Sequence, residues 1–269
     1  MTSHLKLAEQ FLSLHRKGIP LLLANVWDVG SARLIASLGY EALATTSGGH
    51  AGTMGRHDGK VDREEALVHA RLLADATTLP VSADLENGFG DSPEQVAETI
   101  RLAGETGLAG ASIEDYTGNP DDPIYSRDLA VARIEAAAKA AQEVEIVLTA
   151  RCENHIRGRS DLADTIERLQ AYEAAGAHVV YAPGLADLDE IRRVTASVDV
   201  PVNVLSLPNG PSIEELASAG VARVSVGSAF FNVAMNALAK AGREWRDEGT
   251  HGFWPDAIGG MVATKDAFE

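Results

Sequence analysis

Two carboxylates separated by one residue, Asp84 and Glu86, form the most chemically informative pair in the chain. They follow the apolar run 79–83, which is typical of a short buried strand. Side chains two apart on a strand point the same way, so we expect both carboxylates side by side at its exit. Two like charges this close raise the pKa of one group unless a cation lies between them. The spacing predicts a site for a hard ion, Mg²⁺ or Mn²⁺, with a solvated acidic loop as the alternative.

Other polar residues follow other apolar runs in the same way. Glu114 ends the run after 110, and we expect it close enough to share the metal directly or through water. Arg151 offers a planar fork that matches a carboxylate, although it could equally be a salt-bridge partner of a neighbouring acid. The segment Ser47-Gly48-Gly49 can turn backbone N–H groups toward an anion, with a structural turn as the alternative.

The elements that must position these residues are strands alternating with helices. Eight strand-like runs occur: Leu21–Ala24, Ala42–Thr46, Val81–Asp84, Ala111–Glu114, Ile146–Ala150, His178–Tyr181, Val200–Val204 and Arg223–Val226. Eight strand–helix units in one domain-sized chain predict a (β/α)₈ barrel of the TIM type. A doubly wound open sheet is the rival, disfavoured by the count and by the lack of a Gly-x-Gly-x-x-Gly motif after the first strand. In a barrel, the carboxyl ends of all eight strands meet at one mouth.

Helix signals precede, separate and follow the strands. Starts resembling capping boxes occur at Asp62, Ser92 and Ser212. An amphipathic helix over Leu5–Lys17 is expected to close the N-terminal end of the barrel. A long helix over Ala229–Arg246 carries more apolar residues than one barrel face buries, so we expect part of it to pack against another subunit. Residues 250–269 show no clear periodicity. We predict a single domain over 1–269, with its barrel core at about 20–246.

Composition excludes several classes of protein. A formal net charge of −16 argues against a nucleic-acid surface, and no apolar run approaches the roughly 18 residues of a membrane span. The N-terminus lacks the pattern of a signal peptide, and Cys152 is the only cysteine, which fits a reducing cytoplasm. We therefore expect a cytoplasmic protein with a small-molecule partner and neither a nucleic-acid nor a membrane partner. No lysine lies at a strand end, which disfavours a Schiff-base aldolase.

Taken together, these segments resemble the isocitrate lyase/phosphoenolpyruvate mutase superfamily from Leu21 to about Leu238. The resemblance rests on 24–28, 46–49, 84–90, 113–115, 149–151 and 201–203. It implies a (β/α)₈ barrel, usually a tetramer whose late helix is exchanged between paired subunits. It also implies Mg²⁺, a 2-oxo or 2-hydroxy acid substrate and a pyruvate-like enolate.

The resemblance also implies roles for individual residues. Asp84 and Glu86 would serve the metal ion with Glu114 nearby, and Asp58 would orient the metal shell. Arg151 and Asn203 would grip the substrate, whose carboxylate the segment Ser47, Gly48 and Gly49 would hold. Trp27 and Thr46, which lie in the resembling segments, complete the expected substrate site.

One loop departs from the superfamily pattern. Its carbon–carbon lyases carry Lys-x-Cys-Gly-His after the fourth strand, whereas residues 116–125 here contain no Lys, Cys or His. Cys152 follows Arg151 on a strand and is expected to point outward. This departure disfavours ordinary isocitrate lyase activity. We expect a carbon–carbon lyase similar to 2-methylisocitrate lyase, in which water, Tyr125 or His50 delivers the proton. The alternatives are phosphorus–carbon chemistry, for which only Asn119 has a possible counterpart in this loop, and a protein that binds a 2-oxo acid without turnover.

Overall fold

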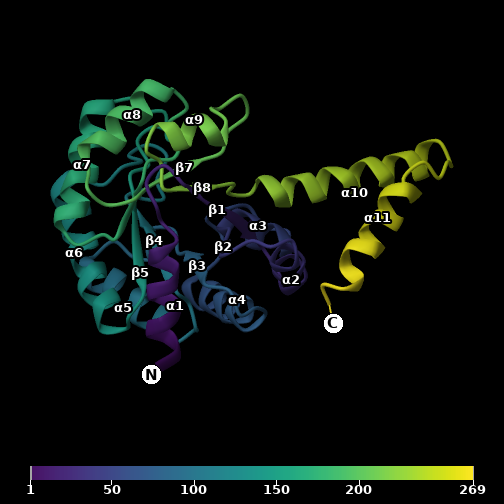
Figure 1. The fold of residues 1–269 in the computed structure, drawn as a ribbon, viewed down its shortest axis with the longest axis horizontal. Helices are drawn as coiled ribbons and strands as arrows, with labels where there is room; N and C mark the ends of the chain where they lie inside the picture. The colour runs from purple at the N-terminus through teal and green to yellow at the C-terminus, as the bar shows by residue number, and fades with distance from the viewer. Residues whose placement is uncertain (1, 269) are drawn as a thin grey trace.

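Eight parallel strands close into a barrel in the computed structural model, which describes residues 2–268 (Figure 1). Each strand pairs with its neighbours in sequence, and β1 closes the ring by pairing with β8. The predicted (β/α)₈ barrel is confirmed, and the open sheet is excluded. The strands are β1 Leu21–Val26, β2 Leu43–Thr45, β3 Val81–Asp84, β4 Gly110–Glu114, β5 Val147–Arg151, β6 Val179–Tyr181, β7 Val202–Leu205 and β8 Arg223–Ser225.

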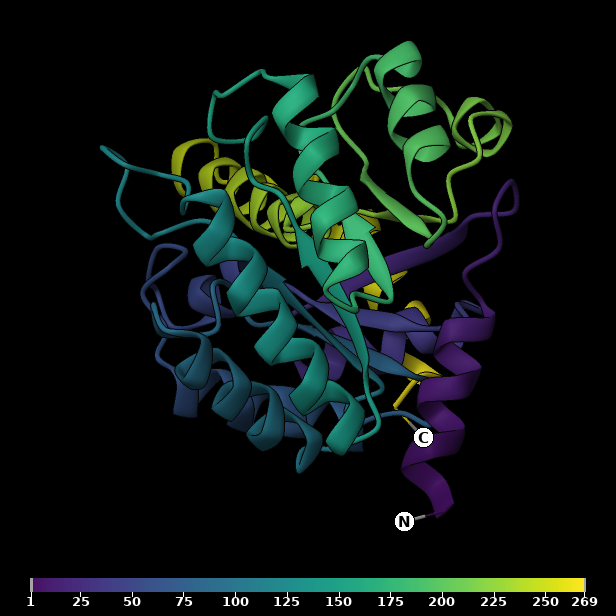
Figure 2. The same cartoon turned by 90° about the vertical axis from the view of Figure 1, so that its left-hand side faces the viewer.

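Helices surround the barrel (Figure 2), and all but the last two bury apolar residues in the protein interior. The predicted capping boxes at Asp62, Ser92 and Ser212 are confirmed, since each side chain accepts a hydrogen bond from the backbone three residues on. The helices are α1 Thr2–Ser13, α2 Val29–Ser37, α3 Ser47–Thr53, α4 Arg63–Asp75, α5 Pro93–Gly104, α6 Arg127–Glu143, α7 Leu162–Ala174, α8 Leu188–Ser197, α9 Ile213–Ser218, α10 Ala229–Asp247 and α11 Trp254–Lys265. None of the helices described is long and apolar enough to cross a bilayer.

The N-terminal end of the barrel is closed by α1, as the sequence predicted. Ala8 and Phe11 pack with Leu21, Leu23 and Val147, which begin or lie early in their strands, in one apolar cluster. The helix ends at Ser13, short of the predicted Lys17. Just beyond it, His15 Nδ1 lies 2.8 Å from the Phe11 carbonyl oxygen and His15 Nε2 lies 3.2 Å from Arg223 Nη1.

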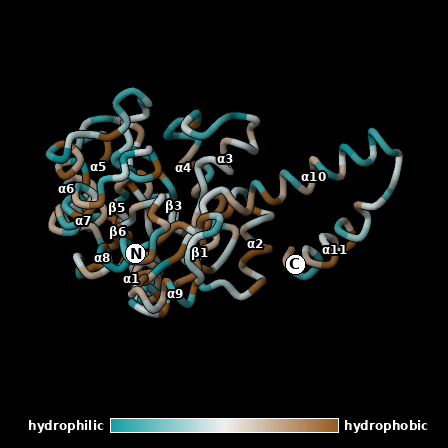
Figure 3. The backbone as a smooth tube through the Cα atoms, turned by 90° about the horizontal axis from the view of Figure 1, so that it is seen from above, coloured by the Kyte–Doolittle hydropathy of each residue, from teal (hydrophilic) through white to brown (hydrophobic). Residues whose placement is uncertain are grey.

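The C-terminal helices form an arm that extends away from the barrel (Figures 1 and 3). No residue of α10 or α11 is buried. α11 lies in the segment for which the sequence showed no clear periodicity, so that part of the sequence analysis missed an element. The arm contacts the barrel near its start, where the Phe231 ring packs edge-on against Trp27 at 5.6 Å between centroids.

Candidate active site

A cavity of about 630 Å³ opens among the C-terminal strand ends and continues into the barrel. Eight of the residues predicted for the site line it: Thr46, Ser47, Asp58, Asp84, Glu86, Glu114, Arg151 and Asn203. They come from β3, β4, β5 and β7, from the loop after β3, from the start of α3 just after β2, and from the loop after α3, as expected for the mouth of such a barrel. The fold therefore brings together residues up to 157 positions apart in sequence, as between Thr46 and Asn203.

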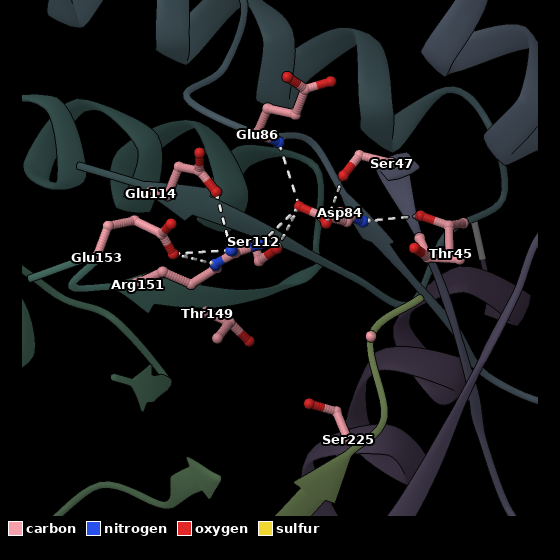
Figure 4. A network of polar contacts seen from close by, with 12 residues as sticks. Thr45, Ser47, Asp84, Glu86, Ser112, Glu114, Thr149, Arg151, Glu153 and Ser225 are labelled. Carbon is pink, nitrogen blue, oxygen red and sulfur yellow. Dashed lines mark hydrogen bonds and ion pairs between the residues drawn. The ribbon is translucent and has the colours of Figure 1, made fainter. Parts of the chain in front are cut away.

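Arg151 lies at the centre of the acidic side chains (Figure 4). Its Nη1 donates to Asp84 Oδ1 at 2.9 Å, and its Nη2 lies 3.0 Å from Glu114 Oε2. The same Nη2 donates to Glu153 Oε1 at 2.7 Å. Register explains the contact with Glu114, because Glu114 and Arg151 are paired neighbours on β4 and β5. One guanidinium thus holds three carboxylates from three different elements.

Asp84 and Glu86 do not lie side by side as the alternation of a strand predicted. β3 ends at Asp84, and Glu86 has a φ of 49°, so the alternation stops before Glu86. The Glu86 backbone N–H donates to Asp84 Oδ1 at 3.3 Å, while the Glu86 carboxylate points away from Asp84 (Figure 4). Asp84 is held by Ser47 Oγ at 3.1 Å and by its own N–H, which donates to Thr45 Oγ1 at 2.8 Å.

Two of these carboxyl groups hold their protons unusually tightly. Burial, followed by the charges of Asp84 and Asp58, raises the pKa of Glu86 to about 8. Burial and the charge of Glu153 raise the pKa of Glu114 well above its usual value. At both groups, burial outweighs the opposite effect of the nearby Arg151 and Arg157 on the pKa.

This donor set fits a hard divalent cation, although its side chains do not already form a metal-binding cluster. Within residues 2–268, no three His, Cys, Asp or Glu side chains converge as a ligand set, because Arg151 holds Asp84 and Glu114 and Glu86 turns away. Asp84, Glu86 and Glu114 offer only oxygen ligands, which Mg²⁺ and Mn²⁺ prefer. A divalent ion would stabilise the charged form of Glu86, which burial and then the charges of Asp84 and Asp58 disfavour.

A second set of charged residues holds Glu153 in place beside Arg151, and of these the sequence analysis did not single out Arg157. Arg157 contacts Glu153 at 3.1 Å and stacks 3.5 Å from the centre of the Tyr116 ring. Asp115 accepts from the Glu153 backbone N–H at 2.8 Å and from the Tyr172 hydroxyl at 2.6 Å. The i, i+4 spacing of Glu153 and Arg157 was a detectable signal, but one expected within a helix rather than in a loop after a strand.

The loop between β3 and α5 is held by a buried arginine on α6. Arg133 Nη1 donates to the carbonyl oxygens of Gly90 and Asp91, each at 2.6 Å, and its Nη2 donates to that of Asn87. The Arg133 guanidinium also lies 4.2 Å from the centre of the Tyr125 ring. Three carbonyls of the loop that carries Glu86 are therefore fixed by one side chain.

The segment Ser47-Gly48-Gly49 is the first turn of a short helix, α3. Thr46 caps it by accepting from the Gly49 N–H at 3.2 Å, and the Thr46 hydroxyl lies 2.8 Å from Ser228 Oγ. A Cβ on Gly48 would lie 2.8 Å from Ser228 Oγ, so a larger residue would clash there. Gly48, Gly49 and Trp27 do not line the cavity, although we predicted them in the substrate site.

The candidate proton donors lie outside the cavity lining. The Tyr125 hydroxyl donates to Asp91 at 2.5 Å, beneath the loop after β3. The His50 ring stacks on His69 at 3.7 Å between centroids. The Cys152 thiol is buried in the apolar cluster between strands and helices, so the predicted outward direction of Cys152 is confirmed. The placement of Tyr125 and His50 does not favour either as the donor.

Comparison with known proteins identifies relatives over most of the chain. The model of the family described as phosphoenolpyruvate phosphomutase matches residues 11–246. A 2-methylisocitrate lyase of Escherichia coli K12 is 31% identical over 243 residues, which cover 86% of this chain and 81% of that protein. An oxaloacetate decarboxylase of Chromohalobacter salexigens is 30% identical over 234 residues, covering 83% and 80% of the two chains. A crystal structure from Burkholderia cenocepacia J2315, named only in general terms as a lyase/mutase, is 53% identical with a TM-score of 0.90, covering 94% of this chain and 92% of that one.

Proposed function

Because the chain belongs to the phosphoenolpyruvate phosphomutase family and is an enzyme of that group, we propose a specific reaction for it. It is a Mg²⁺- or Mn²⁺-dependent lyase that cleaves a carbon–carbon bond of a small 2-oxo or 2-hydroxy acid through a pyruvate-like enolate. The supporting observation is the group of Asp84, Glu86 and Glu114 in one cavity, with the pKa of Glu86 raised to about 8. Such a site calls for a cation and is placed to bind an oxygen-rich substrate.

In this proposal, Asp84, Glu86 and Glu114 hold the metal, and Asp58 orients its hydration shell. When bound, the divalent ion acts as a Lewis acid that stabilises negative charge on the substrate. The Ser47 hydroxyl, which lines the cavity beside Asp84, would face developing negative charge on the carboxylate end. The metal would take over part of the interaction with the carboxylates that Arg151 contacts, so Arg151 could bind the substrate. Asn203 would bind the substrate from deeper in the barrel.

In the proposed reaction, water donates the proton to the enolate. The loop of residues 116–125 has no thiol, and Cys152 is buried outside the barrel interior. Tyr125 and His50 do not line the cavity. Water that enters through the open mouth is the remaining donor of those we considered, and it would protonate the departing enolate after bond cleavage.

A second candidate reaction is phosphorus–carbon chemistry on a phosphonate such as phosphonopyruvate. It is favoured by Lys60, a cation in the cavity wall that the sequence analysis did not consider for the site. A lysine can pair with a phosphonate as a point charge. The non-catalytic reading of the sequence is not retained, since the relatives are enzymes.

Nuclear magnetic resonance would separate the two reactions. A panel of 2-oxo, 2-hydroxy and phosphono acids would be incubated with the protein and Mg²⁺, and proton and phosphorus spectra followed with time. We expect a 2-oxo or 2-hydroxy acid to lose a carbon fragment, and Asp84→Ala to abolish this turnover while the circular dichroism spectrum stays unchanged. A new phosphorus signal from a phosphonate would favour the second reaction. Metal-independent turnover, or full activity of Asp84→Ala, would contradict the proposed site.

We also propose that the protein forms a homo-oligomer, a dimer or tetramer, through the arm of α10 and α11. Val233, Leu238 and Trp245 on α10 are each at least 65% exposed, as are Met261 and Val262 on α11. Leu238 and Trp245, seven residues apart, lie on the same side of α10, and none of these five side chains is buried. Exchange of the arm between paired subunits would cover them.

A further inference from the structure

Arg223 is a buried cation inside the barrel that no carboxylate neutralises. It is the first residue of β8, is 4% exposed, and lines the same cavity as Asp84 and Arg151. Its Nη1 lies 3.2 Å from His15 Nε2, and its Nη2 donates to Thr149 Oγ1 at 3.2 Å. Its Nε has no hydrogen-bond partner, and in the part of the chain described no acid lies within ion-pair distance of it.

His15 does not supply the missing negative charge. Its Nδ1 is 2.8 Å from the Phe11 carbonyl oxygen, which can only accept, so Nδ1 carries the proton and Nε2 accepts from Arg223. Burial, followed by the charge of Arg223, lowers the pKa of His15 to about 3, so this ring is neutral. Burial also lowers the pKa of Arg223, to about 10, which leaves it charged at neutral pH. An unpaired buried charge is costly to a fold, and a bound anion would offset that cost.

Of the two guanidinium groups, Arg223 has fewer charged partners than Arg151 and is therefore the one available to bind an anionic ligand. Arg151 already contacts Asp84, Glu114 and Glu153. Arg223 contacts only a neutral ring and a hydroxyl. An incoming carboxylate displaces no acid from Arg223, whereas at Arg151 it competes with three.

Several inward-facing residues of the cavity are polar, whereas barrel interiors are usually filled by branched apolar side chains. Ser82, Ser112, Asn203 and Ser225 all line the cavity. Asn203 is 1% exposed, its Nδ2 donates to Ser225 Oγ at 2.9 Å, and its Oδ1 has no partner. A hydroxyl can also donate, so the Asn203 amide can be turned without loss of that hydrogen bond, which presents its NH₂ group to the cavity.

Register sets the depth of Arg223 below the metal-binding carboxylates. Its partner Thr149 lies two residues before Arg151 on β5, a distance of about 7 Å along a strand. The cavity is continuous between these two levels. A small ligand with two acidic groups can therefore reach both.

We propose that Arg223, Asn203 and Ser225 form a second anion site that binds the substrate's distal carboxylate, so that the substrate is a dicarboxylate directed into the barrel. This inference rests on the proposed function for the position of the first carboxylate. Under this proposal, Arg223 distinguishes diacids from monoacids, and Arg151 positions the metal-binding carboxylates. The competing explanation is that Arg223 only anchors α1 through His15.

The test is calorimetric titration of oxalate, succinate, glutarate and butyrate in the presence of Mg²⁺. We expect glutarate or succinate to bind the unaltered protein at least tenfold more tightly than butyrate. Arg223→Met should weaken binding of the longer diacid by about 10- to 100-fold, the range for loss of charge-assisted hydrogen bonds, and that of oxalate by less than about threefold. His15→Gln is the matched control, because it removes the anchor to α1 yet keeps the guanidinium, and it should leave diacid affinity within about threefold.

The outcomes separate this inference from the proposed function. If oxalate fails to bind the unaltered protein with Mg²⁺, the proposed metal site is wrong. If oxalate binds but diacids are not preferred over butyrate, or Arg223→Met keeps full diacid affinity, only the second anion site is wrong. Should Arg223→Met not fold, the diacid-to-monoacid ratio of the unaltered protein still decides. Inorganic phosphate is the probe for binding of a free anion at this site. If phosphate is displaced but diacids are not preferred over butyrate, the assignment of the site to the substrate is overturned.

Discussion

Arg151 contacts more carboxylates than a single bidentate pairing can serve. Its three acidic partners come from β3, β4 and the loop after β5, so it fixes the relative positions of Asp84 and Glu114 before any ligand arrives. A planar guanidinium can contact acids along several edges at once, whereas an ammonium group is a compact point charge. The shape of this side chain therefore matters as well as its charge.

Arg151→Lys should lower kcat/KM on the true substrate about 30- to 1000-fold, which corresponds to roughly 2–4 kcal/mol of transition-state stabilisation. The charge is kept, but the geometry that joins the three acids is lost. Steady-state kinetics would measure the effect, with thermal unfolding as the check on folding. Arg157→Lys is the matched control, since Arg157 contacts Glu114 and Glu153 from a more exposed position, and it should stay within about threefold. Near-normal activity of Arg151→Lys would make Arg151 merely a structural ion-pair partner.

Cys152 provides a second residue-scale prediction. Its thiol is fully buried among apolar side chains, away from the cavity lining. Cys152→Ser should keep kcat within about threefold and lower the free energy of unfolding by about 1 kcal/mol, as is usual for a small change in a packed interior. Chemical denaturation and steady-state kinetics measure the two quantities, and Cys152→Ala shows the effect of lost volume alone. A large fall in kcat at unchanged stability would identify the thiol as the missing acid.

At the scale of elements, the sequence predicted all eight strands but not every helix. Apolar runs bounded by glycine mark buried strands clearly. The alternation of side chains along β5 correctly predicted that Arg151 points into the barrel and Cys152 away from it. α3 was missed because Gly48, Gly49 and Gly52 give it low helix propensity, and it forms around the Thr46 cap. The predicted direction of the Glu86 side chain was wrong. The alternation of side chains along a strand was applied beyond the end of β3, to a residue whose backbone is in the left-handed region.

The packing of α1 and α4 makes stability depend on pH through two histidines. Burial lowers the pKa of His15 to about 3 and that of His69 to about 4. Below the usual value of 6.5, the unfolded chain binds these protons and the folded chain does not, so the free energy of unfolding falls as pH decreases. Each group contributes up to about 1.4 kcal/mol per pH unit between pH 6.5 and about 4.

His15→Gln should therefore reduce the dependence of the free energy of unfolding on pH over this range by the contribution of His15. His69→Gln should reduce it by the contribution of His69. Urea unfolding at half-unit steps of pH measures the slope for the unaltered protein, each variant and the double variant. Parallel curves for the unaltered protein and His15→Gln would show that His15 is not held neutral beside Arg223.

At the scale of the whole molecule, the arm of α10 and α11 is the part least explained by a single chain. Its apolar side chains lie beyond the barrel. The arm contacts the rest of the chain through Phe231 near the start of α10 and again after α11, where Phe268 lies beside Gly30. The same Phe231 ring packs over Gly52 in the last turn of α3, the helix that begins beside the cavity with Thr46 and Ser47. One aromatic side chain thus connects the arm with the helix that begins at the cavity.

Leu238→Glu combined with Trp245→Glu should convert the protein from a dimer or tetramer to a monomer of 28.4 kDa. These two side chains are 65% and 67% exposed, so the changes should leave the barrel folded and disrupt only a contact between subunits. Sedimentation velocity at micromolar concentration measures the mass. Lys240→Glu, a charge change on the same helix, is the control and should remain assembled. A monomeric unaltered protein would contradict the proposed assembly.

The pairing of β1 with β8 also has a consequence for how the chain is made. The ring cannot close until both its first and its last strand exist, and about 200 residues separate them. At ordinary rates of translation, that interval lasts roughly 10–40 s. Throughout it, β1 offers an open edge to any neighbouring nascent chain. The ribosome-bound protein should therefore depend on chaperones until β8 emerges, and truncations before Arg223 should accumulate as aggregates rather than as partial barrels.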